Sequence, residues 1–151
     1  MNFDISAITL STEQTEELGK AVADAILEDT SLPRFVALFG DLGVGKTAFV
    51  RGFTQAVAPN ARVKSPTFAL VNEYKGEHCS VFHFDMYRIE DEDELYSIGF
   101  YDYADRGGIC ITEWSENIEY ALPESYIRVE IRKDSELNTD SRSVCFEIFG
   151  D

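Results

Sequence analysis

Features that would point to a cross-linked, membrane-bound or secreted protein are missing from this sequence. Its cysteines are odd in number and widely spaced, at Cys79, Cys110 and Cys145, which argues against a disulfide framework or a zinc ribbon. No apolar run approaches the roughly 18 residues of a transmembrane helix. The N-terminus has neither the basic nor the apolar segment of a secretory signal. We therefore expect a cytoplasmic protein that does not associate with membranes.

Basic residues are also scarce. Only 13 Lys and Arg stand against 28 Asp and Glu, which gives a formal net charge of −15. Much of the excess lies in residues 85–124, which carry 12 acids and two bases. A field of this sign repels nucleic-acid backbones. We therefore do not expect the chain to bind DNA or RNA directly without a partner.

The chain does have enough apolar material for a folded core. Its 151 residues are 44% hydrophobic and 13% aromatic, with only ten glycines and four prolines. A chain of this length buries about 68–70% of its unfolded surface, so it needs no disulfide or metal for stability. We predict a single domain that spans residues 1–151.

The order of periodic segments predicts an α/β architecture. Residues 12–28 have the apolar spacing of a helix and follow a capping box that begins at Ser11. The five apolar residues 35–39 predict a strand buried on both faces, and a second helix begins near Lys46. Further strands are expected at 68–74 and 79–84 as a hairpin, at 109–111, and at 126–131 and 143–148 as an antiparallel pair. Together they predict a three-layer P-loop NTPase-like domain with a mixed parallel and antiparallel central sheet.

The glycine-rich turn between the strand at 35–39 and the second helix is the strongest functional signal. Residues 40–47 read Gly-Asp-Leu-Gly-Val-Gly-Lys-Thr and match the phosphate-binding pattern G-x-x-x-x-G-K-[ST] in the required strand–turn–helix context. In such a loop, backbone N–H groups bind phosphate oxygens, Lys46 reaches the β- and γ-phosphates, and the Thr47 hydroxyl binds Mg²⁺. The predicted nucleotide contacts are Asp41, Leu42, Gly43, Val44, Gly45, Lys46, Thr47 and Ala48.

Binding of Mg²⁺ and activation of water need further side chains, usually from the ends of neighbouring strands. Asp85 and Glu113 each follow a predicted strand, so either carboxylate suits a site at the carboxyl edge of the sheet. Thr67 stands in a stiff Ser-Pro-Thr turn, where a loop hydroxyl can contact the γ-phosphate and Mg²⁺. Taken alone, each of these residues also fits an ordinary solvated loop or turn.

Four segments, taken together, resemble one known family. They are residues 40–47, Ser65-Pro66-Thr67-Phe68, His83-Phe84-Asp85-Met86-Tyr87-Arg88 and Ile111-Thr112-Glu113-Trp114. In this order and spacing they are similar to the bacterial tRNA threonylcarbamoyladenosine (t6A) biosynthesis ATPases of the TsaE type. The similarity runs from the first predicted helix to about Ala121.

The resemblance implies an ATPase that uses ATP and Mg²⁺ and supports N6-threonylcarbamoylation of adenosine 37 in tRNA. It implies that Thr47 and Glu113 bind Mg²⁺. Catalytic roles fall to Lys46, to Asp85 in a switch-like segment near the γ-phosphate, and to Thr67 in a second switch-like segment. The implied partners are t6A transferase proteins of the TsaD and TsaB type. These would hold the tRNA, so contact with tRNA would be indirect.

Other functions share the phosphate loop. A small-molecule kinase usually needs a mobile lid that contains arginines, and the sequence has no Arg-rich lid. A nucleotide-gated binding module with negligible turnover is compatible with the acidic surface. A GTPase is disfavoured, because no N-K-x-D segment for reading guanine is present.

Overall fold

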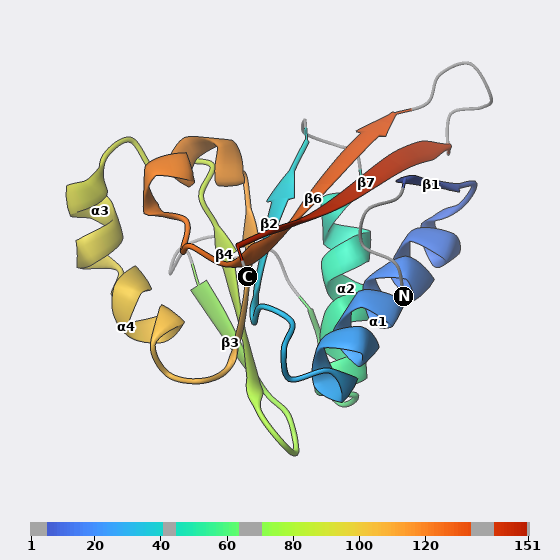
Figure 1. Ribbon diagram of the computed structural model, residues 1–151, viewed down its shortest axis with the longest axis horizontal. Coiled ribbons are helices and arrows are strands. Elements are labelled where there is room, and N and C mark those ends of the chain that lie inside the picture. Colours follow the sequence, from blue (N-terminus) through green and yellow to red (C-terminus); the bar gives the residue numbers. More distant parts are fainter. Residues whose placement is uncertain (1–5, 41–44, 64–70, 134–140, 151) are drawn as a thin grey trace.

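The computed structural model describes residues 6–40, 45–63, 71–133 and 141–150, which form one seven-stranded sheet with helices on both faces (Figure 1). The strands are β1 (Ser6–Thr9), β2 (Phe35–Phe39), β3 (Val71–Lys75), β4 (Ser80–Asp85), β5 (Ile109–Glu113), β6 (Tyr126–Lys133) and β7 (Arg142–Phe149). The helices are α1 (Thr12–Glu28), α2 (Lys46–Val57), α3 (Glu92–Ser97), α4 (Phe100–Ala104) and the 3-10 segment η1 (Ser115–Ala121).

The sheet has the order β1-β7-β6-β2-β5-β4-β3 and is parallel at its centre. Strands β6, β2, β5 and β4 are parallel neighbours, whereas β3, β7 and β1 pair antiparallel at the two sides. This arrangement confirms the mixed sheet and both predicted antiparallel pairs. It also brings the carboxyl ends of β2, β4 and β5 to one edge, where open α/β sheets bind ligands.

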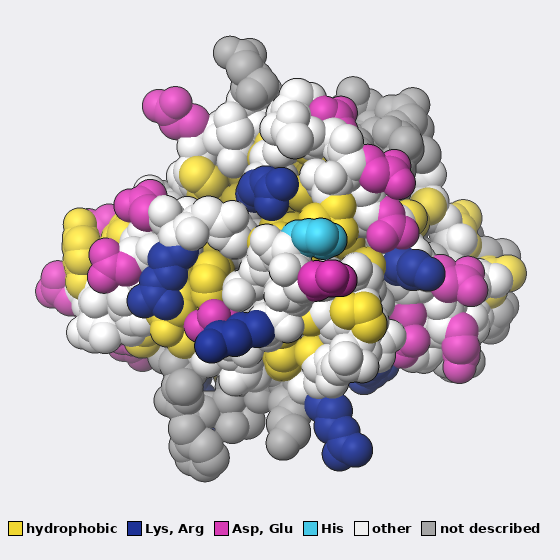
Figure 2. All heavy atoms as spheres, turned by 90° about the horizontal axis from the view of Figure 1, so that it is seen from below, with side chains coloured by type: hydrophobic (Ala, Val, Ile, Leu, Met, Phe, Trp, Pro, Cys, Tyr) yellow, Lys and Arg dark blue, Asp and Glu magenta, His cyan; other side chains and the backbone are white. Residues whose placement is uncertain are grey.

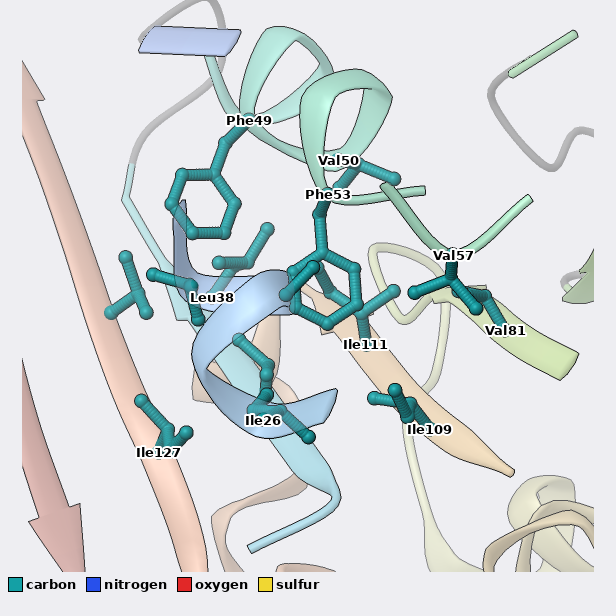
Figure 3. Packing of buried hydrophobic residues seen from close by; sticks show 14 of the residues in the cluster. Ile26, Leu38, Phe49, Val50, Phe53, Val57, Val81, Ile109, Ile111 and Ile127 are labelled. Atoms are coloured by element: carbon teal, nitrogen blue, oxygen red, sulfur yellow. The ribbon is translucent and has the colours of Figure 1, made fainter. Parts of the chain in front are cut away.

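Two layers of helices cover the sheet. Helices α1 and α2 pack on one face, and α3 and α4 lie on the other (Figure 1). Figure 3 shows the first of the two cores, in which Phe53 of α2 and Ile26 of α1 pack over Leu38. All five residues of β2 are buried, as expected of an apolar run that contacts helices on both sides.

Alternation along the strands decides which side chains face α2. Val81 in β4 and both Ile109 and Ile111 in β5 belong to the core beneath α1 and α2, whereas Phe82 and Phe84 belong to the opposite core. Successive strand residues point to opposite faces. The side chains at positions 83, 85 and 113 therefore lie on the α2 side of the sheet.

Helices α1 and α2 approach each other closely through glycines. A Cβ atom at Gly52 would overlap the carbonyl oxygen of Glu16, and one at Gly19 would overlap the carbonyl oxygen of Phe49. The Arg51 guanidinium bonds the Glu16 carboxylate across the same contact, at 2.6 Å. This packing fixes α2, and with it the start of α2 beside the glycine-rich turn.

Helix α1 begins as predicted. The Ser11 hydroxyl accepts the Gln14 backbone N–H at 3.1 Å, while the Gln14 side chain reaches back to the Leu10 N–H, at 2.7 Å, instead of the Ser11 N–H. The acidic run at 90–94, which the sequence also lets one interpret as a solvated helix start, forms the start of α3, and Asp91 caps that helix.

Three elements have no counterpart among the predictions: β1, α4 and the 3-10 segment η1. The expected strand at 68–74 is described only from Val71, where β3 begins.

No described helix combines the length and the apolar character that a membrane crossing requires. On the face shown in Figure 2, acidic side chains are spread out with basic side chains between them and form no single charged patch.

Candidate nucleotide and magnesium site

The glycine-rich turn is described at its two ends. Gly40, after β2, and Gly45, before α2, have φ angles of 142° and 101°, in the region that favours glycine. Gly45 caps α2 without a side chain, so the first backbone N–H groups of the helix have no side-chain cap. Helix N-termini of this kind bind anions. The predicted contacts at residues 41–44 (Asp41, Leu42, Gly43 and Val44) lie outside the described residues, whereas Lys46, Thr47 and Ala48 form the first turn of α2.

Lys46 is held at the start of the loop. Its side chain is buried, and Nζ donates to the Gly40 carbonyl oxygen at 2.6 Å. The same ammonium lies 3.8 Å from the centroid of the Trp114 ring, within cation–π range. On the other side of the Gly40 peptide, the N–H of Gly40 donates to the Glu116 carboxylate at 3.1 Å. Glu116, after the end of β5, therefore contacts Gly40 directly, and Trp114 contacts the lysine that binds the Gly40 carbonyl.

Trp114 has an unusual backbone. Its φ of 57° and ψ of 43° place it in the left-handed region, where it stands alone among the described non-glycine residues. This conformation costs about 1–2 kcal/mol for an L-residue. Hydroxyl contacts between Thr112 and Ser115 hold the turn, and the Tyr87 ring packs on the indole at a centroid distance of 5.0 Å. The strained turn is what presents the indole to Lys46.

A second cation lies next to the loop. Arg142, the first residue of β7, places its guanidinium beside Gly45 and donates to the Ser141 carbonyl oxygen at 2.9 Å. Nothing in the sequence marks Arg142 as part of the site, because it lies about a hundred positions beyond the loop. Of the other cations near the loop in sequence, Arg51 pairs with Glu16 and Arg88 is exposed.

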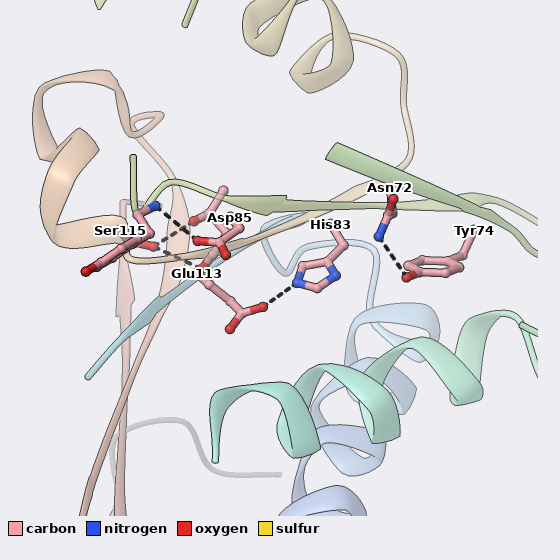
Figure 4. A network of polar contacts seen from close by, with 8 residues as sticks. Asn72, Tyr74, His83, Asp85, Glu113 and Ser115 are labelled. Carbon is pink, nitrogen blue, oxygen red and sulfur yellow. Dashed lines mark hydrogen bonds and ion pairs between the residues drawn. The ribbon is translucent and has the colours of Figure 1, made fainter. Parts of the chain in front are cut away.

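Asp85 and Glu113 come together at the carboxyl edge of the sheet. They are paired residues of the parallel strands β4 and β5, and both are the last residue of their strand. Glu113 is buried, with 6% of its surface exposed, and Asp85 is half-buried. The Asp85 carboxylate accepts the Tyr87 N–H at 3.0 Å. Figure 4 shows both side chains, with His83 beside Glu113.

The environment of Asp85 favours its neutral form. Burial raises the pKa of this carboxyl group above 3.8, and the nearby Glu113 charge raises it further. The N–H of Tyr87 and the Lys46 ammonium oppose the shift without reversing it. A raised pKa in a group beside a phosphate loop is typical of functional sites.

His83 is a member of this cluster that sequence analysis missed. Its Nε2 lies 2.5 Å from Glu113 Oε2, and the imidazole ring is completely buried. In the sequence, His83 lacks metal-ligand spacing with His78 and Cys79, and this favours a structural role for it. The available signal was its position two residues before Asp85, which places both side chains on the same face of β4.

The residues at this edge fit Mg²⁺ bound together with a nucleotide. Mg²⁺ in phosphate-transfer sites takes one or two protein oxygens and fills its other positions with water and phosphate. The buried Glu113 carboxylate and the Thr47 hydroxyl in the first turn of α2 supply that donor set. In the described part of the chain, no group of three or more His, Cys, Asp or Glu residues forms an independent metal site. Thr67, the remaining predicted side chain, lies outside the described residues.

The parallel central strands, the G-x-x-x-x-G-K-T turn after β2 and the carboxylates on neighbouring strand ends define a P-loop NTPase-like protein. The model of one family in this class, described as "Threonylcarbamoyl adenosine biosynthesis protein TsaE", matches residues 9–144. The chain belongs to the TsaE family. The match extends past Ala121 and includes β6 and the first residues of β7.

Individual relatives support the assignment. The tRNA threonylcarbamoyladenosine biosynthesis protein TsaE of Haemophilus influenzae is 43% identical over 114 residues, which are 75% of this chain and 72% of the relative. The protein of the same name from Bacillus subtilis is 33% identical over 142 residues, which are 94% of this chain and 84% of the relative. The crystal structure of Bacillus subtilis YdiB superposes with a TM-score of 0.71 at 26% identity, covering 97% of this chain and 86% of that one.

Proposed function

We propose that this protein is a Mg²⁺-dependent ATPase that supports t6A formation at adenosine 37 of tRNA. Two lines of support meet here: its relatives carry the name of that biosynthesis, and its first α2 turn lies beside two carboxylates at the sheet edge. The observation that carries the proposal is the buried Lys46 ammonium beside Gly40, because it stands where the phosphate-loop motif places the lysine that binds the β- and γ-phosphates.

In this proposal each side chain has a separate task. The Lys46 ammonium turns from the Gly40 carbonyl oxygen to the β- and γ-phosphates, a change of partner within the same loop. Thr47 and Glu113 would hold Mg²⁺, which would supply positive charge to offset the negative charge of the phosphates. Asp85, next to Glu113, orients the attacking water, and Thr67 contacts the γ-phosphate from its own loop.

The proposed partners are t6A transferase proteins of the TsaD and TsaB type, which carry the tRNA. The net charge of −15 supports indirect contact with tRNA, because an acidic protein is repelled by a phosphate backbone unless another protein intervenes. The proposed location is the cytoplasm, which is also the location that the sequence predicts.

The test is ATP hydrolysis and reconstituted t6A formation over several turnovers, with and without the partner proteins. Lys46→Ala and Glu113→Gln should each reduce both activities at least about 100-fold. The matched controls are Lys75→Ala and Glu119→Gln, which remove the same charges from exposed positions and should act like the wild type. Activity in Lys46→Ala equal to that of Lys75→Ala would contradict the proposal.

The same assays separate the alternative functions. A small-molecule kinase would yield a phosphorylated product in place of free phosphate. A nucleotide-gated binding module would support t6A formation in the Asp85→Asn and Glu113→Gln variants, because binding alone would suffice. If those variants lost t6A formation but still bound nucleotide, the result would favour the ATPase over the binding module.

A further inference from the structure

The polar contact of His83 is directed to one carboxylate. Its Nε2 lies 2.5 Å from Glu113 Oε2, while Nδ1 is buried and has no hydrogen-bond partner among the described residues. The Tyr74 ring stacks on the imidazole at a centroid distance of 6.5 Å, which restricts the ring from the β3 side (Figure 4). A histidine that only filled the core would not need this single, short contact with the residue at the end of β5.

The sheet itself sets the contact. His83 pairs in register with Ile111, and Asp85 pairs with Glu113, so His83 and Glu113 are diagonal neighbours on one face of adjacent parallel strands. When the Glu113 carboxylate is ionised it only accepts hydrogen bonds, and Nε2 of the matching His83 tautomer is then the donor. Both groups are buried, so solvent competes little for the bond.

We propose that His83 is a positioning residue for magnesium: its Nε2–H fixes Oε2 of Glu113 and leaves Oε1 to bind the metal. The inference rests on the proposed Mg²⁺–nucleotide function of the site. A carboxylate at a strand end can rotate about its side-chain torsions, and each rotation moves a metal-binding oxygen. Partners that hold a metal ligand in place change metal affinity by about 10–100-fold when they are removed.

Asn and Gln provide a matched pair of variants. In His83→Gln the side-chain amide reaches about as far as Nε2 and can donate to Glu113, whereas the amide of His83→Asn is one methylene shorter and cannot reach that position. Both variants place one neutral amide in the same buried site. A purely structural role for His83 would be disturbed similarly by the two substitutions.

The measurement is calorimetric binding of ADP to the full chain, in EDTA and at increasing Mg²⁺. We expect binding in EDTA to stay within about threefold of wild type in both variants. His83→Asn should raise the Mg²⁺ concentration for half-maximal enhancement of ADP binding by about 10–100-fold, and His83→Gln should restore most of the response. Circular dichroism melts establish that each variant is folded.

Glu113→Gln completes a double-mutant cycle. If His83 acts through Glu113, His83→Asn should add little to the Mg²⁺ defect of Glu113→Gln. An unchanged Mg²⁺ response in His83→Asn, or equal defects in Asn and Gln variants, would overturn the positioning role while the proposed function stood. If the wild-type protein bound no nucleotide, or bound it equally well with and without Mg²⁺, both the proposed function and this inference would be wrong.

Discussion

The Lys46 ammonium lies 3.8 Å from the centroid of the Trp114 ring and donates to the Gly40 carbonyl oxygen. The ammonium of the phosphate-loop lysine thus has two partners within the protein itself. Trp114 reaches it only because the turn after β5 holds a tryptophan in a left-handed backbone conformation. Strain of this kind persists where the surrounding structure enforces it, and it is common at functional sites.

Exchange of partners by Lys46 should be visible as a change in Trp114 fluorescence. Trp114 is the single tryptophan of the chain, so its emission reports this site alone. We expect saturating Mg²⁺–ADP to change the emission, because the ammonium leaves the indole for the phosphates. Lys46→Met should alter the emission of the nucleotide-free protein and abolish most of the response. Identical emission with and without bound Mg²⁺–ADP would show that Lys46 keeps its contact.

The close approach of α1 and α2 predicts a stability effect at Gly52. Gly52→Ala places a methyl group on the Glu16 carbonyl oxygen, and the helices must separate to accept it. We expect the free energy of unfolding to fall by about 1–3 kcal/mol in urea denaturation. Gln55→Ala, at an exposed position of the same helix, is the control and should stay within about 0.5 kcal/mol of wild type. Equal stabilities of the two variants would refute the tight crossing.

Asp85 predicts a pH dependence of stability. Its pKa in the folded protein is raised above the ordinary 3.8, so the folded state binds this proton more tightly than the unfolded state does. The contribution of Asp85 to the free energy of unfolding therefore falls as pH rises from 3.8 through the raised pKa. Above that pKa the loss of stability, which is the cost of the buried charge, is complete. Asp85→Asn removes the cost.

Thermal melts across pH test the Asp85 prediction. At pH 7 the Asp85→Asn variant should melt about 1–3 °C above wild type. The difference should disappear below pH 3.8, where the carboxyl group is protonated in both states. If Asp85→Asn were less stable than wild type at pH 7, the folded protein would stabilise the Asp85 carboxylate, and the pKa of this group would be lowered instead of raised.

Local patterns in the sequence account for the elements nearest the loop. Helix α1, strand β2 and helix α2 each carry a complete signal of their own: a capping residue with helical spacing, a continuous apolar run, and a glycine followed by an amphipathic segment. Strand β1 carries no such signal, because it has four residues of which one is buried. Its place is set by pairing with β7, which lies at the far end of the chain.

The site likewise contains residues that local sequence patterns predict and contacts that they do not. Lys46 and Thr47 follow from a contiguous motif, and Asp85 and Glu113 were expected as residues at strand ends. The contact of His83 with Glu113 could not be predicted, because it depends on β4 and β5 being adjacent, parallel and in the observed register. The contacts of Gly40 with Glu116 and of Lys46 with Trp114 depend likewise on the turn after β5.

The most direct test of the central claim is calorimetric titration of Mg²⁺–ATP into wild-type protein and the Lys46→Ala variant. We expect one site per chain in the wild type and at least a tenfold weaker affinity in Lys46→Ala, with an unchanged melting profile showing that the variant is folded. Equal affinities in the two proteins, or no binding by the wild type, would contradict it.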